Sequence, residues 1–569
     1  MPYRAPVADL GFVLRHVAGY GQVAATDRFA HASWETAQAV LDEAGKLAEG
    51  VLAPLNRTGD RNPARLEGGV VHTASGFAEG YRALASGGWV GMAADPAFGG
   101  MGLPQAIATA VHEMFAGACL SLQLNPLLTQ GQIEALEHHA DDALKALYLP
   151  KLASGEWSGT MNLTEPQAGT DLGALVTRAE PRADGTYAVT GQKIYITWGD
   201  ADFLPNVCHL VLARLPDAPE GSAGISLFLV PKFLPDGEGR PATRNGVSVI
   251  GLEHKLGIHA SPTCVMQFDR ATGWLVGEAN RGLAAMFTMM NNARLGVGAQ
   301  GVGVAEAALQ QALDYAQVRR QGRTPVAGAG MIVDHADVRR MLATMRAQVF
   351  SARAIALSCA VAIDMARATG SADWAARAAL LTPIAKACGT ETGHAVAHEA
   401  IQVHGGMGFI EETGIAQYAR DVRITAIYEG TNGIQAMDLV GRKLSDAGEA
   451  AFRLIDEVQA GAEAARATHP DLAGDVWQAA EALREATEAM VRAQMNDRFG
   501  GALPYLRAFA LVLGGHFHLK AALAAGNGPR LALAQVAIRR LMPMHAAHLA
   551  EAREGAGGLY DLSPDDLAA

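Results

Sequence analysis

The feature that most constrains the fold is a change of hydrophobic period along the chain. Up to about residue 155, apolar residues recur at helical spacing. Between about Glu156 and Arg281 the chain consists of short β-rich runs, separated by Gly, Pro, Asp and Asn, and several runs alternate apolar and polar residues. Helical spacing returns at Gly282. We therefore predict an α+β multidomain protein in which an antiparallel β domain, a sandwich or a barrel, lies between two helical domains.

The segments before and within the β region are short enough to assign individually. The predicted helices are Val7–Val17, Ser33–Leu52, Ala78–Ser86, Pro104–Cys119 and Gly131–Ala153. The predicted strands are Tyr187–Val189, Lys193–Trp198, Cys208–Arg214, Ile225–Pro231, Val247–Ile250 and Cys264–Phe268. The polar, glycine-bearing stretch Pro235–Asn245 predicts an exposed loop.

The later part of the chain is predicted to be helical almost throughout. The helices expected first are Leu283–Val318, Asp334–Thr369, Ala372–His404 and Gly433–Leu444. After Ser445, the amphipathic runs Ala451–Ala465, Val476–Met495, Pro504–Ala525 and Arg530–Glu554 predict a compact four-helix appendage. The expected divisions are an arm at 1–34, helical domains at 35–155 and 282–445, the β domain at 156–281, and the appendage at 446–569.

Composition favours a folded protein with a large core. The chain has 569 residues, of which 50% are hydrophobic and 18% charged, so it can bury several cores and disorder is not expected. Abundant glycine and alanine favour closely packed helices. The formal charge of −12 is spread without acidic or basic blocks, and nothing in it indicates nucleic acid or an anionic membrane as a partner.

The cysteines and the most apolar segments indicate a cytoplasmic protein. Five scattered cysteines without a Cys-x-x-Cys pair predict reduced, buried thiols, with neither a disulfide framework nor a thiolate metal site. The first residues contain no apolar stretch typical of a secretory signal. The apolar run Ala508–Gly526 contains His516, His518 and Lys520, and it is expected to be a buried helix and not a transmembrane segment.

The stretch Ile427–Asn432, with the sequence Ile-Tyr-Glu-Gly-Thr-Asn, is the strongest candidate for chemistry. It sets the carboxylate of Glu429 beside a glycine that allows backbone to approach a ligand. Taken alone, such a glutamate is better explained as a solvated charge at a helix end. Other segments are needed to reverse this interpretation.

Three further segments have the composition of ligand-binding backbone, although each has an ordinary explanation. Met161–Asp171 places hydroxyls and small residues at the start of the β region, as a polar turn also would. Gly191–Trp198 predicts a strand with Tyr195 and Thr197 on one face, where a ring can stack and a hydroxyl can donate. Gln402–Gly408 is a glycine-rich helix end that can cradle a phosphate or serve only as a C-cap.

In this order and spacing, the four segments resemble the acyl-CoA dehydrogenase family. The resemblance covers about residues 35–445 and implies an N-terminal helical domain, a middle β domain and a C-terminal four-helix bundle. The long Pro235–Asn245 stretch, the appendage, and the motifs at Glu253–His259 and Arg319–Arg323 resemble the large bacterial branch that includes 3-methylmercaptopropionyl-CoA dehydrogenase.

The resemblance implies FAD as cofactor and α,β-desaturation of an acyl-CoA thioester to the trans-2-enoyl-CoA. Glu429 would remove the α proton while the β hydrogen leaves as hydride to flavin N5. An exposed glutamate with a pKa near ~4 is too weak a base for a carbon acid, so the reaction requires burial that raises this pKa. Hydrogen bonds from the Glu429 N–H and a flavin hydroxyl would stabilise the enolate. Both a short thioether substrate, 3-methylmercaptopropionyl-CoA, and short or medium acyl-CoAs suit the branch.

Further site residues are implied by position in the family motifs. The residues expected to bind FAD are Met161, Leu163, Thr164, Gly169, Thr170, Tyr195, Ile196, Thr197, Arg319, Gln402, Val403, Gly405, Gly406 and Thr431. The residues expected to contact substrate are Thr170, Asn291, Arg294 and Gly430. No metal site is expected. Some family members carry the base immediately before the arginine that matches Arg294, where this chain has Ala293. This leaves Glu429 as the candidate.

Three departures from the family pattern affect cofactor contacts but not the base. Gly322 stands where an aromatic residue is usual, Ala336 follows His335 where glutamine is common, and Gly433 replaces a common glutamine. The expected partners are an electron-transferring flavoprotein and a second copy of the chain, with a dimer favoured. Two alternatives remain open from the motifs: an oxidase of the same fold, and a catalytically silent FAD-bound scaffold.

Overall fold

The computed structural model describes residues 3–325 and 330–569. Its chain contacts divide it into two compact units. The helical unit comprises Met1–Gly45, Pro104–Gly117 and Arg294–Ala569, and the β-containing unit comprises Lys46–Leu103 and Ala118–Ala293. Two long helices, α6 (Gln105–His139) and α8 (Gly282–Val318), contribute residues to both units. Each unit is described separately below.

The β-containing unit is built on a seven-stranded sheet. Its strands are β3 (Trp157–Asn162), β4 (Arg178–Pro181), β5 (Tyr187–Thr197), β6 (Asn206–Arg214), β7 (Ile225–Pro231), β10 (Val247–Leu252) and β11 (Thr263–Val276). The strand order is β10-β11-β5-β4-β6-β3, and β7 pairs with both β11 and β6. The pairing is antiparallel except that β6 runs parallel to β3 and to β4. The prediction of a purely antiparallel domain therefore needs this correction.

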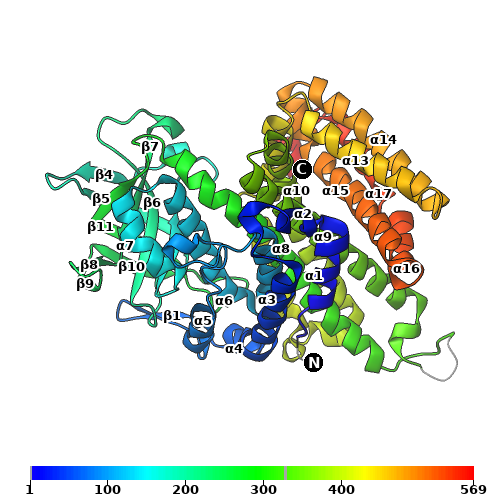
Figure 1. Cartoon of the computed structure of the whole chain (residues 1–569), viewed down its shortest axis with the longest axis horizontal. Coiled ribbons are helices and arrows are strands. Elements are labelled where there is room, and N and C mark those ends of the chain that lie inside the picture. The colour runs from blue at the N-terminus through cyan, green and yellow to red at the C-terminus, as the bar shows by residue number, and fades with distance from the viewer. Residues whose placement is uncertain (1–2, 326–329) are drawn as a thin grey trace. The chain divides into compact units, whose positions relative to one another are not determined.

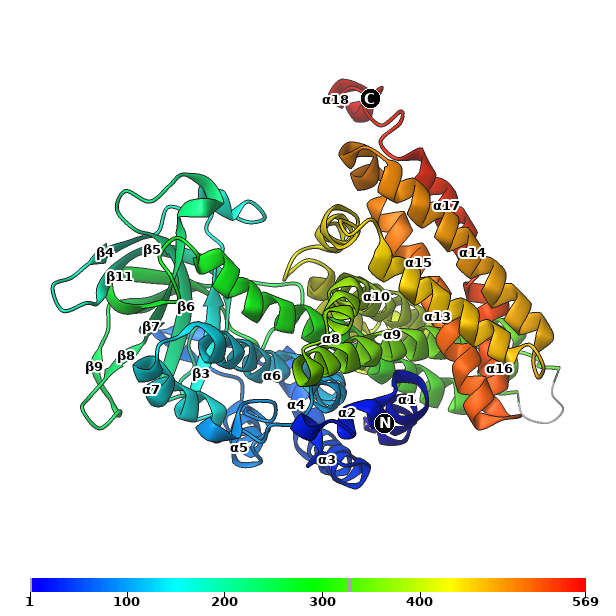
Figure 2. The same cartoon turned by 45° about the horizontal axis from the view of Figure 1, so that its top comes forward.

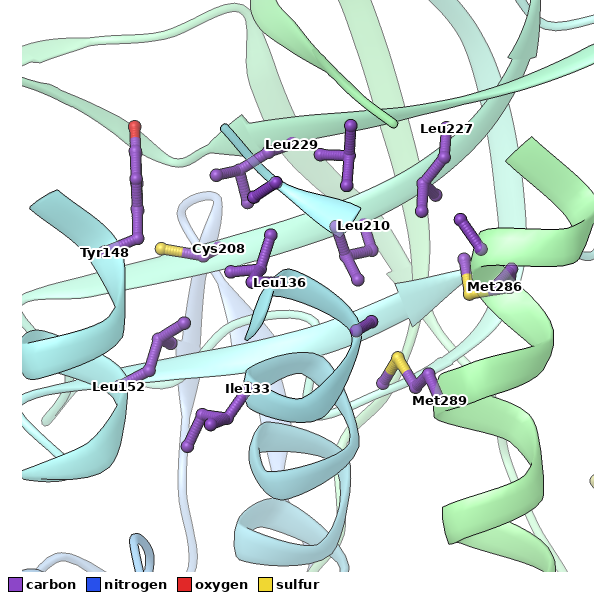
Figure 3. Close-up of a cluster of buried hydrophobic side chains, with 14 of the residues drawn as sticks. Ile133, Leu136, Tyr148, Leu152, Cys208, Leu210, Leu227, Leu229, Met286 and Met289 are labelled. Carbon is purple, nitrogen blue, oxygen red and sulfur yellow. The ribbon is translucent and has the colours of Figure 1, made fainter. Parts of the chain in front are cut away.

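The sheet is buried on both faces. Along β6, Leu210 and Leu212 belong to one hydrophobic cluster while Val211 and Ala213 belong to another, because successive side chains of a strand point to opposite faces. Figure 3 shows the first cluster, in which strand residues meet side chains from α6, from α7 (Asp142–Ala153) and from the start of α8. Its labelled members are Ile133, Leu136, Tyr148, Leu152, Cys208, Leu210, Leu227, Leu229, Met286 and Met289. Each fully buried leucine contributes about 1.5–3 kcal/mol relative to an exposed one.

Several short elements of this unit differ from the sequence prediction. The expected loop Pro235–Asn245 is largely a hairpin of β8 (Phe233–Pro235) and β9 (Pro241–Arg244). The two strands expected between Tyr187 and Trp198 are one strand, which continues through Gly191. The strands β1 (Arg65–Glu67) and β2 (Val70–His72) were not predicted, nor were β3 and β4. Among these, β3 pairs with β6, which is distant in sequence, whereas β1 pairs with β2 and β4 with β5 across short turns. Short runs of this kind depend on their partners for strand geometry.

Further helices of the β-containing unit lie in its N-terminal part. They include the π-turn Ala48–Leu52, α4 (Ala53–Arg61) and α5 (Phe77–Ser86). The segment between the predicted helices Pro104–Cys119 and Gly131–Ala153 is itself helical, since α6 runs from Gln105 to His139 with a kink at Cys119. The real break falls before α7, where the Asp141 side chain caps the helix by accepting a hydrogen bond from Leu144 N at 2.8 Å.

The helical unit packs two groups of helices together with the N-terminal arm. The first group contains the later part of α8, α9 (Ala336–Thr369), α10 (Ala372–His404), α11 (Ile415–Val422) and α12 (Asn432–Asp438). The second contains α13 (Glu449–Ala465), α14 (Pro470–Arg492), α15 (Met495–Ala525), α16 (Pro529–Val536) and α17 (Met544–Glu554), followed by α18 (Pro564–Ala568). Figures 1 and 2 both show α13, α14, α15 and α17 side by side. The expected last helix is divided, because a π-turn at Ala537–Leu541 separates α16 from α17.

Small residues allow α8 and α10 to pack backbone against backbone. A Cβ at Gly389 would lie 2.3 Å from the Gly298 carbonyl oxygen, and one at Gly301 would lie 2.3 Å from the Gly389 carbonyl oxygen. No real side chain fits these distances. The glycine content noted in the sequence therefore has a direct packing function at this crossing.

The N-terminal arm packs against the body of the helical unit through a buried charge cluster. The arm contains α1 (Val7–Val13), the π-turn Leu14–Ala18 and α2 (Tyr20–Ala24), and α3 (Trp34–Leu47) follows it. Its apolar residues Leu10, Val13, Leu14 and Val17 are buried, as their spacing predicted. Asp9 on α1 pairs with Arg353 of α9, which is fully buried and also binds Glu113 and Glu306.

Three helices of the described chain, α6, α9 and α15, have an 18-residue window long and apolar enough to cross a membrane by length and composition. These windows are 100%, 83% and 72% buried inside the protein, so their apolar surface is already covered. Within α15, His516 and His518 are buried, in agreement with the buried helix predicted there. Four cysteines are buried as expected, whereas Cys388 is partly exposed.

Candidate active site

Glu429 lies on a strained loop between the short 3-10 turn Arg423–Ala426 and α12. Its φ of +56° is in the left-handed region, which non-glycine residues rarely occupy, and Gly430 follows at +84°. This backbone is held by two side chains, one from Thr431, the cap of α12, and one from Gln435 within α12. The Thr431 hydroxyl accepts a hydrogen bond from Ile434 N at 3.2 Å, and Gln435 Nε2 donates to the carbonyl oxygens of Glu429 and Gly430 at 3.2 Å each. Strain held in this way is characteristic of functional sites.

The environment of Glu429 makes its carboxyl group a much stronger base than an exposed glutamate. Burial raises its pKa to about 7, against the opposing effect of the cations Arg294 and Lys386. The side chain is half-buried. Within residues 3–325 and 330–569, no side chain or backbone group donates a hydrogen bond to this carboxylate. Its oxygens are therefore free to accept a proton from a ligand.

Arg294 is buried on α8 and is held by the last residue of α12. Its guanidinium donates to Asp438 Oδ2 at 3.2 Å, and Arg442 donates to the other oxygen of the same carboxylate at 2.6 Å. The sequence interpretation placed Arg294 near the active site, and the structure places it within electrostatic range of Glu429. Asn291 lies in the β-containing unit on the same helix and is exposed.

Behind the loop lies a polar network that the motifs did not reveal. Lys386 of α10 donates to Asn432 Oδ1 at 3.0 Å, and Thr390 and Asn432 bond each other through side chains at 3.0–3.1 Å. Next to the base, the Tyr428 hydroxyl donates to Gln300 Oε1. A sequence signal for Lys386 did exist, since it is a lone charge within an apolar helical run. That run does not show which neighbouring element the lysine side chain contacts.

A cavity of about 520 Å³ borders the Glu429 loop. Ile427, Thr431, Asn432 and Gly433 contribute to one side of it. Facing them are the ionisable side chains Glu391, His394, His398, Arg423 and Arg507. Thr431, one of the expected cofactor contacts, therefore borders a space whose lining includes two arginines, two histidines and one glutamate.

The glycine turn and the arginine loop expected to bind the cofactor lie together at one end of the helical unit. The rings of Tyr315 on α8 and His404 on α10 stack with centroids 4.3 Å apart. This contact joins the region of Arg319 to the turn that begins at Gly405, whose φ is +59°. A Cβ at Gly405 or Gly406 would meet no atom within 4 Å. The residues Arg319, Gln402, Gly405 and Gly406 are exposed, whereas Val403 is buried.

This turn is far from Glu429 within one chain. Lys386, whose charge faces Glu429, and Gln402, at the turn, both lie on α10. They are 16 residues apart, which corresponds to about 24 Å along the helix at about 1.5 Å per residue. The structure thus separates two sets of residues that the family motifs associate with one cofactor.

In the β-containing unit, a buried ion pair fixes the Met161–Asp171 segment. The Glu165 carboxylate accepts from Lys193 Nζ at 2.7 Å and from the Thr177 hydroxyl at 2.5 Å. Lys193 also donates to the Leu163 carbonyl oxygen at 3.0 Å, and Ile194 N donates to the Thr164 carbonyl oxygen at 3.0 Å. The segment is thereby held against β5.

The expected contact residues of this segment differ in exposure. Leu163 is buried, Met161 and Thr164 are partly exposed, and Gly169 and Thr170 are exposed. A Cβ at Gly169 would meet no atom within 4 Å. The Asn162 side chain beneath the segment has a buried Oδ1 without a partner among the described residues.

The end of β5 presents the two residues singled out in the sequence. Tyr195 has a φ of +62° and is 59% exposed, because the strand shifts register between Lys193 and Ile196 opposite β11. Ile196 is buried and Thr197 is partly exposed. Trp198, also in the left-handed region, is buried and donates to Ser121 O at 3.0 Å. Tyr195 is therefore an exposed ring on a strained, anchored backbone.

Comparison with known proteins gives consistent family matches along the chain. Family models match residues 35–156 (acyl-CoA dehydrogenase, N-terminal domain), 160–271 (middle domain), 280–444 (C-terminal domain) and 454–563 (acetyl-CoA dehydrogenase C-terminal like).

In the part of the chain that the structure describes, no cluster of His, Cys, Asp and Glu is suited to a metal ion.

Individual relatives cover most of the chain. It is 47% identical to a 3-methylmercaptopropionyl-CoA dehydrogenase of Ruegeria pomeroyi over 81% of this chain and 79% of that protein. It is 37% identical to the broad-specificity linear acyl-CoA dehydrogenase FadE5 of Mycobacterium tuberculosis, over 80% and 78% respectively. The fold is similar to that of Caenorhabditis elegans ACDH-11, solved in complex with C11-CoA, with a TM-score of 0.79, 20% identity, and coverage of 95% of this chain and 91% of that one.

Proposed function

Because this chain belongs to the acyl-CoA dehydrogenase family and is an FAD-dependent oxidoreductase acting on the CH–CH bond of an acyl-CoA, we propose that Glu429 is its catalytic base. The observation that carries this assignment is the half-buried carboxylate on a left-handed backbone, with its pKa raised to about 7. A base with this pKa is substantially ionised at neutral pH and retains a strong affinity for a proton. The adjacent Gly430 leaves room for a thioester.

The proposed reaction begins with transfer of the substrate α proton to a carboxylate oxygen of Glu429. The backbone N–H of Glu429 stabilises the negative charge that develops on the thioester oxygen. Arg294 and Lys386 keep part of the Glu429 population ionised before the transfer. FAD, when bound, supplies the acceptor for the hydride that leaves the β carbon.

The residues of both units fit a flavin dinucleotide. In the β-containing unit, Met161, Leu163, Thr164, Gly169, Thr170, Tyr195, Ile196 and Thr197 would hold it. In the helical unit, Arg319, Gln402, Val403, Gly405, Gly406 and Thr431 would do so. The open space above Gly169, Gly405 and Gly406 supports this assignment, because glycine there is not required by packing within the chain. For substrate contacts we propose Thr170, Asn291, Arg294 and Gly430.

A homodimer would explain the separation of the glycine turn from the base. Gln402 lies about 24 Å along α10 from Lys386, so the turn of one copy would serve the cofactor of the other. Beside the turn, Met407, Phe409 and Ile410 are 46%, 88% and 43% exposed, which suits an interface. Light scattering of the purified protein should give the mass of a dimer, and Phe409→Asp should shift it toward the monomer with loss of FAD.

For the substrate we propose a short acyl-CoA with a thioether, 3-methylmercaptopropionyl-CoA, on the basis of the relative from Ruegeria pomeroyi. The test is anaerobic bleaching of the flavin with a panel of thioesters that includes butyryl-, octanoyl- and 3-methylmercaptopropionyl-CoA. Preference for a straight-chain thioester would overturn the thioether assignment without affecting that of the base.

We further propose an electron-transferring flavoprotein as the electron acceptor and a cytoplasmic location. An acceptor protein is required only if the reduced enzyme is stable in air. Rapid reoxidation with formation of hydrogen peroxide would instead indicate an oxidase.

We also propose domain divisions at residues 35, 156, 282 and 446. They lie close to the limits of the family matches.

The central experiment is Glu429→Gln, which removes the base and preserves the shape of the side chain. The variant should keep bound FAD, seen in its visible spectrum, and lose flavin reduction by acyl-CoA. Undiminished reduction would show that another group takes the proton. If the native protein binds FAD but no thioester in the panel bleaches it, the protein is a silent scaffold.

A further inference from the structure

Lys386 is a buried cation without a buried counter-ion in direct contact. Its side chain is fully buried in the middle of α10. Across the described residues, the only hydrogen bond of its ammonium group goes to the neutral amide oxygen of Asn432, at 3.0 Å, and the group forms no ion pair within 4 Å. Burying a charge in this way is unfavourable unless another group compensates it. A lysine that only filled space would be better replaced by methionine.

The first consequence of Lys386 is local and concerns the backbone beside the base. Asn432 is the first residue of α12 and follows Thr431, the cap of that helix. With Lys386 and Thr390 bound to its side chain, the start of α12 is fixed to α10. The Glu429–Gly430 backbone is in turn fixed to α12 by Gln435. Lys386 is therefore connected to the strained loop through hydrogen bonds.

The second consequence is electrostatic. The charged groups that act electrostatically on Glu429 are Arg294 from α8 and Lys386 from α10. Arg294 is already paired with Asp438, which also binds Arg442. The other carboxylate that affects Lys386 is Glu391, which is bound by Arg507 of α15 at 3.0–3.2 Å. Of the two carboxylates that act on Lys386, Glu391 is therefore paired with an arginine, whereas Glu429 forms no ion pair within the described residues.

We propose that Lys386 is a positioning residue that acts on the base in two ways: its charge favours the ionised carboxylate of Glu429, and its bond to Asn432 holds the loop that carries it. The proposal rests on Glu429 being the base. Lys386 does not touch the reacting atoms. Its own pKa, lowered to about 7 chiefly by burial, indicates that its charge declines as pH rises past neutrality, so its effect should be largest below that pH.

Two substitutions separate charge from hydrogen bonding. Lys386→Gln removes the charge and retains a donor for Asn432, whereas Lys386→Met removes both. Thr390→Val is the matched control, because it removes another partner of Asn432 without changing any charge. The rate of anaerobic flavin reduction is measured from pH 5.5 to 9. The protonated carboxyl of Glu429 is followed independently by its infrared carbonyl band, identified by its disappearance in Glu429→Gln.

The expected result is an upward shift of the Glu429 titration by about one pH unit in both Lys386 variants, since loss of an opposite charge changes a pKa by about 1–3 units. Flavin reduction below the midpoint should then fall about tenfold and recover at high pH. Thr390→Val should leave the midpoint in place.

A structural defect alone would lower the rate equally at every pH and leave the infrared titration unchanged, and this outcome overturns the proposal. If Lys386→Met does not fold, Lys386→Gln decides the matter; failure of both to fold would also overturn it, since the charge would then serve stability. Activity retained by Glu429→Gln would instead refute the proposed function itself.

Discussion

Replacement of Arg353 by methionine should destabilise the helical unit strongly, and the loss should depend on pH. Arg353 is fully buried and donates to Glu113 Oε1 at 2.5 and 2.8 Å, to Glu306 Oε2 at 2.9 Å, and to Asp9 on the N-terminal arm. Methionine would leave Glu113 buried without its cation, and Glu306 with only the partly exposed Arg346. Removing one partner of a buried pair costs about 3–5 kcal/mol. The arm would also lose one of its polar attachments, although Arg530 still binds Asp9.

The sign of the pH effect follows from the two carboxylates. Burial already raises the pKa of Glu113, whereas Arg353 contributes to holding the pKa of Glu306 down. Without Arg353 both pKa values should rise above the unfolded value of about 4.3. The folded variant then binds more protons than the unfolded chain, so its stability increases as pH falls. Each pH unit below the raised pKa recovers about 1.4 kcal/mol per carboxyl group, and the defect should be about 2–3 kcal/mol smaller at pH 6 than at pH 8.

The assay is urea unfolding followed by circular dichroism at both pH values, with Arg346→Met as the control. Arg346 lies on the same helix and also binds Glu306, at 3.1 Å, but its side chain is 39% exposed, so its loss should cost only about 0–1 kcal/mol. Equal effects of the two substitutions at pH 8 would refute the reasoning. So would a defect of Arg353→Met that is the same at pH 6 and pH 8.

Three further outcomes are expected. The rate of flavin reduction in the native enzyme should rise with pH through about 7, the pKa of Glu429, because only the ionised carboxylate accepts a proton; a rate that is constant between pH 6 and 8 in stopped-flow measurements would contradict this. Lys193→Met should leave the buried Glu165 carboxylate without its cation, which lowers stability by about 3–5 kcal/mol and weakens FAD binding, as a flavin-release titration would measure. Gly389→Ala should destabilise the protein by about 1–3 kcal/mol in thermal unfolding, since the new Cβ would lie 2.3 Å from a carbonyl oxygen of α8. The control is Gly474→Ala on α14, where a Cβ would meet no atom within 4 Å. This control should be neutral or stabilise the protein by up to about 1 kcal/mol.

Segments with strong local signals could be located from the sequence. The predicted helix Ala372–His404 and the predicted strand Ile225–Pro231 have the observed bounds. The helix has a cap residue at its start, Ser371, and a glycine at its end, Gly405. These features act within a few residues, so they can be identified without knowledge of the fold.

Elements that depend on distant partners were predicted less well. β3 was not predicted because its strand geometry depends on pairing with β6, which is distant in sequence. The helical stretch directly after the kink at Cys119 lies outside the predicted helices. In both regions tertiary packing overrides weak local preference.

By itself, the sequence determined the helix–β–helix order, the family, the cofactor and the identity of Glu429 as the candidate base, because motif residues stand close together in the chain. Only the tertiary structure decided what makes this glutamate basic. Lys386 and Asn432 are 46 residues apart, and Arg294 and Asp438 are 144 residues apart, so no local pattern links them. Burial and the charges of other helices set the pKa of the carboxyl group, and these exist only once α8, α10 and α12 have packed together.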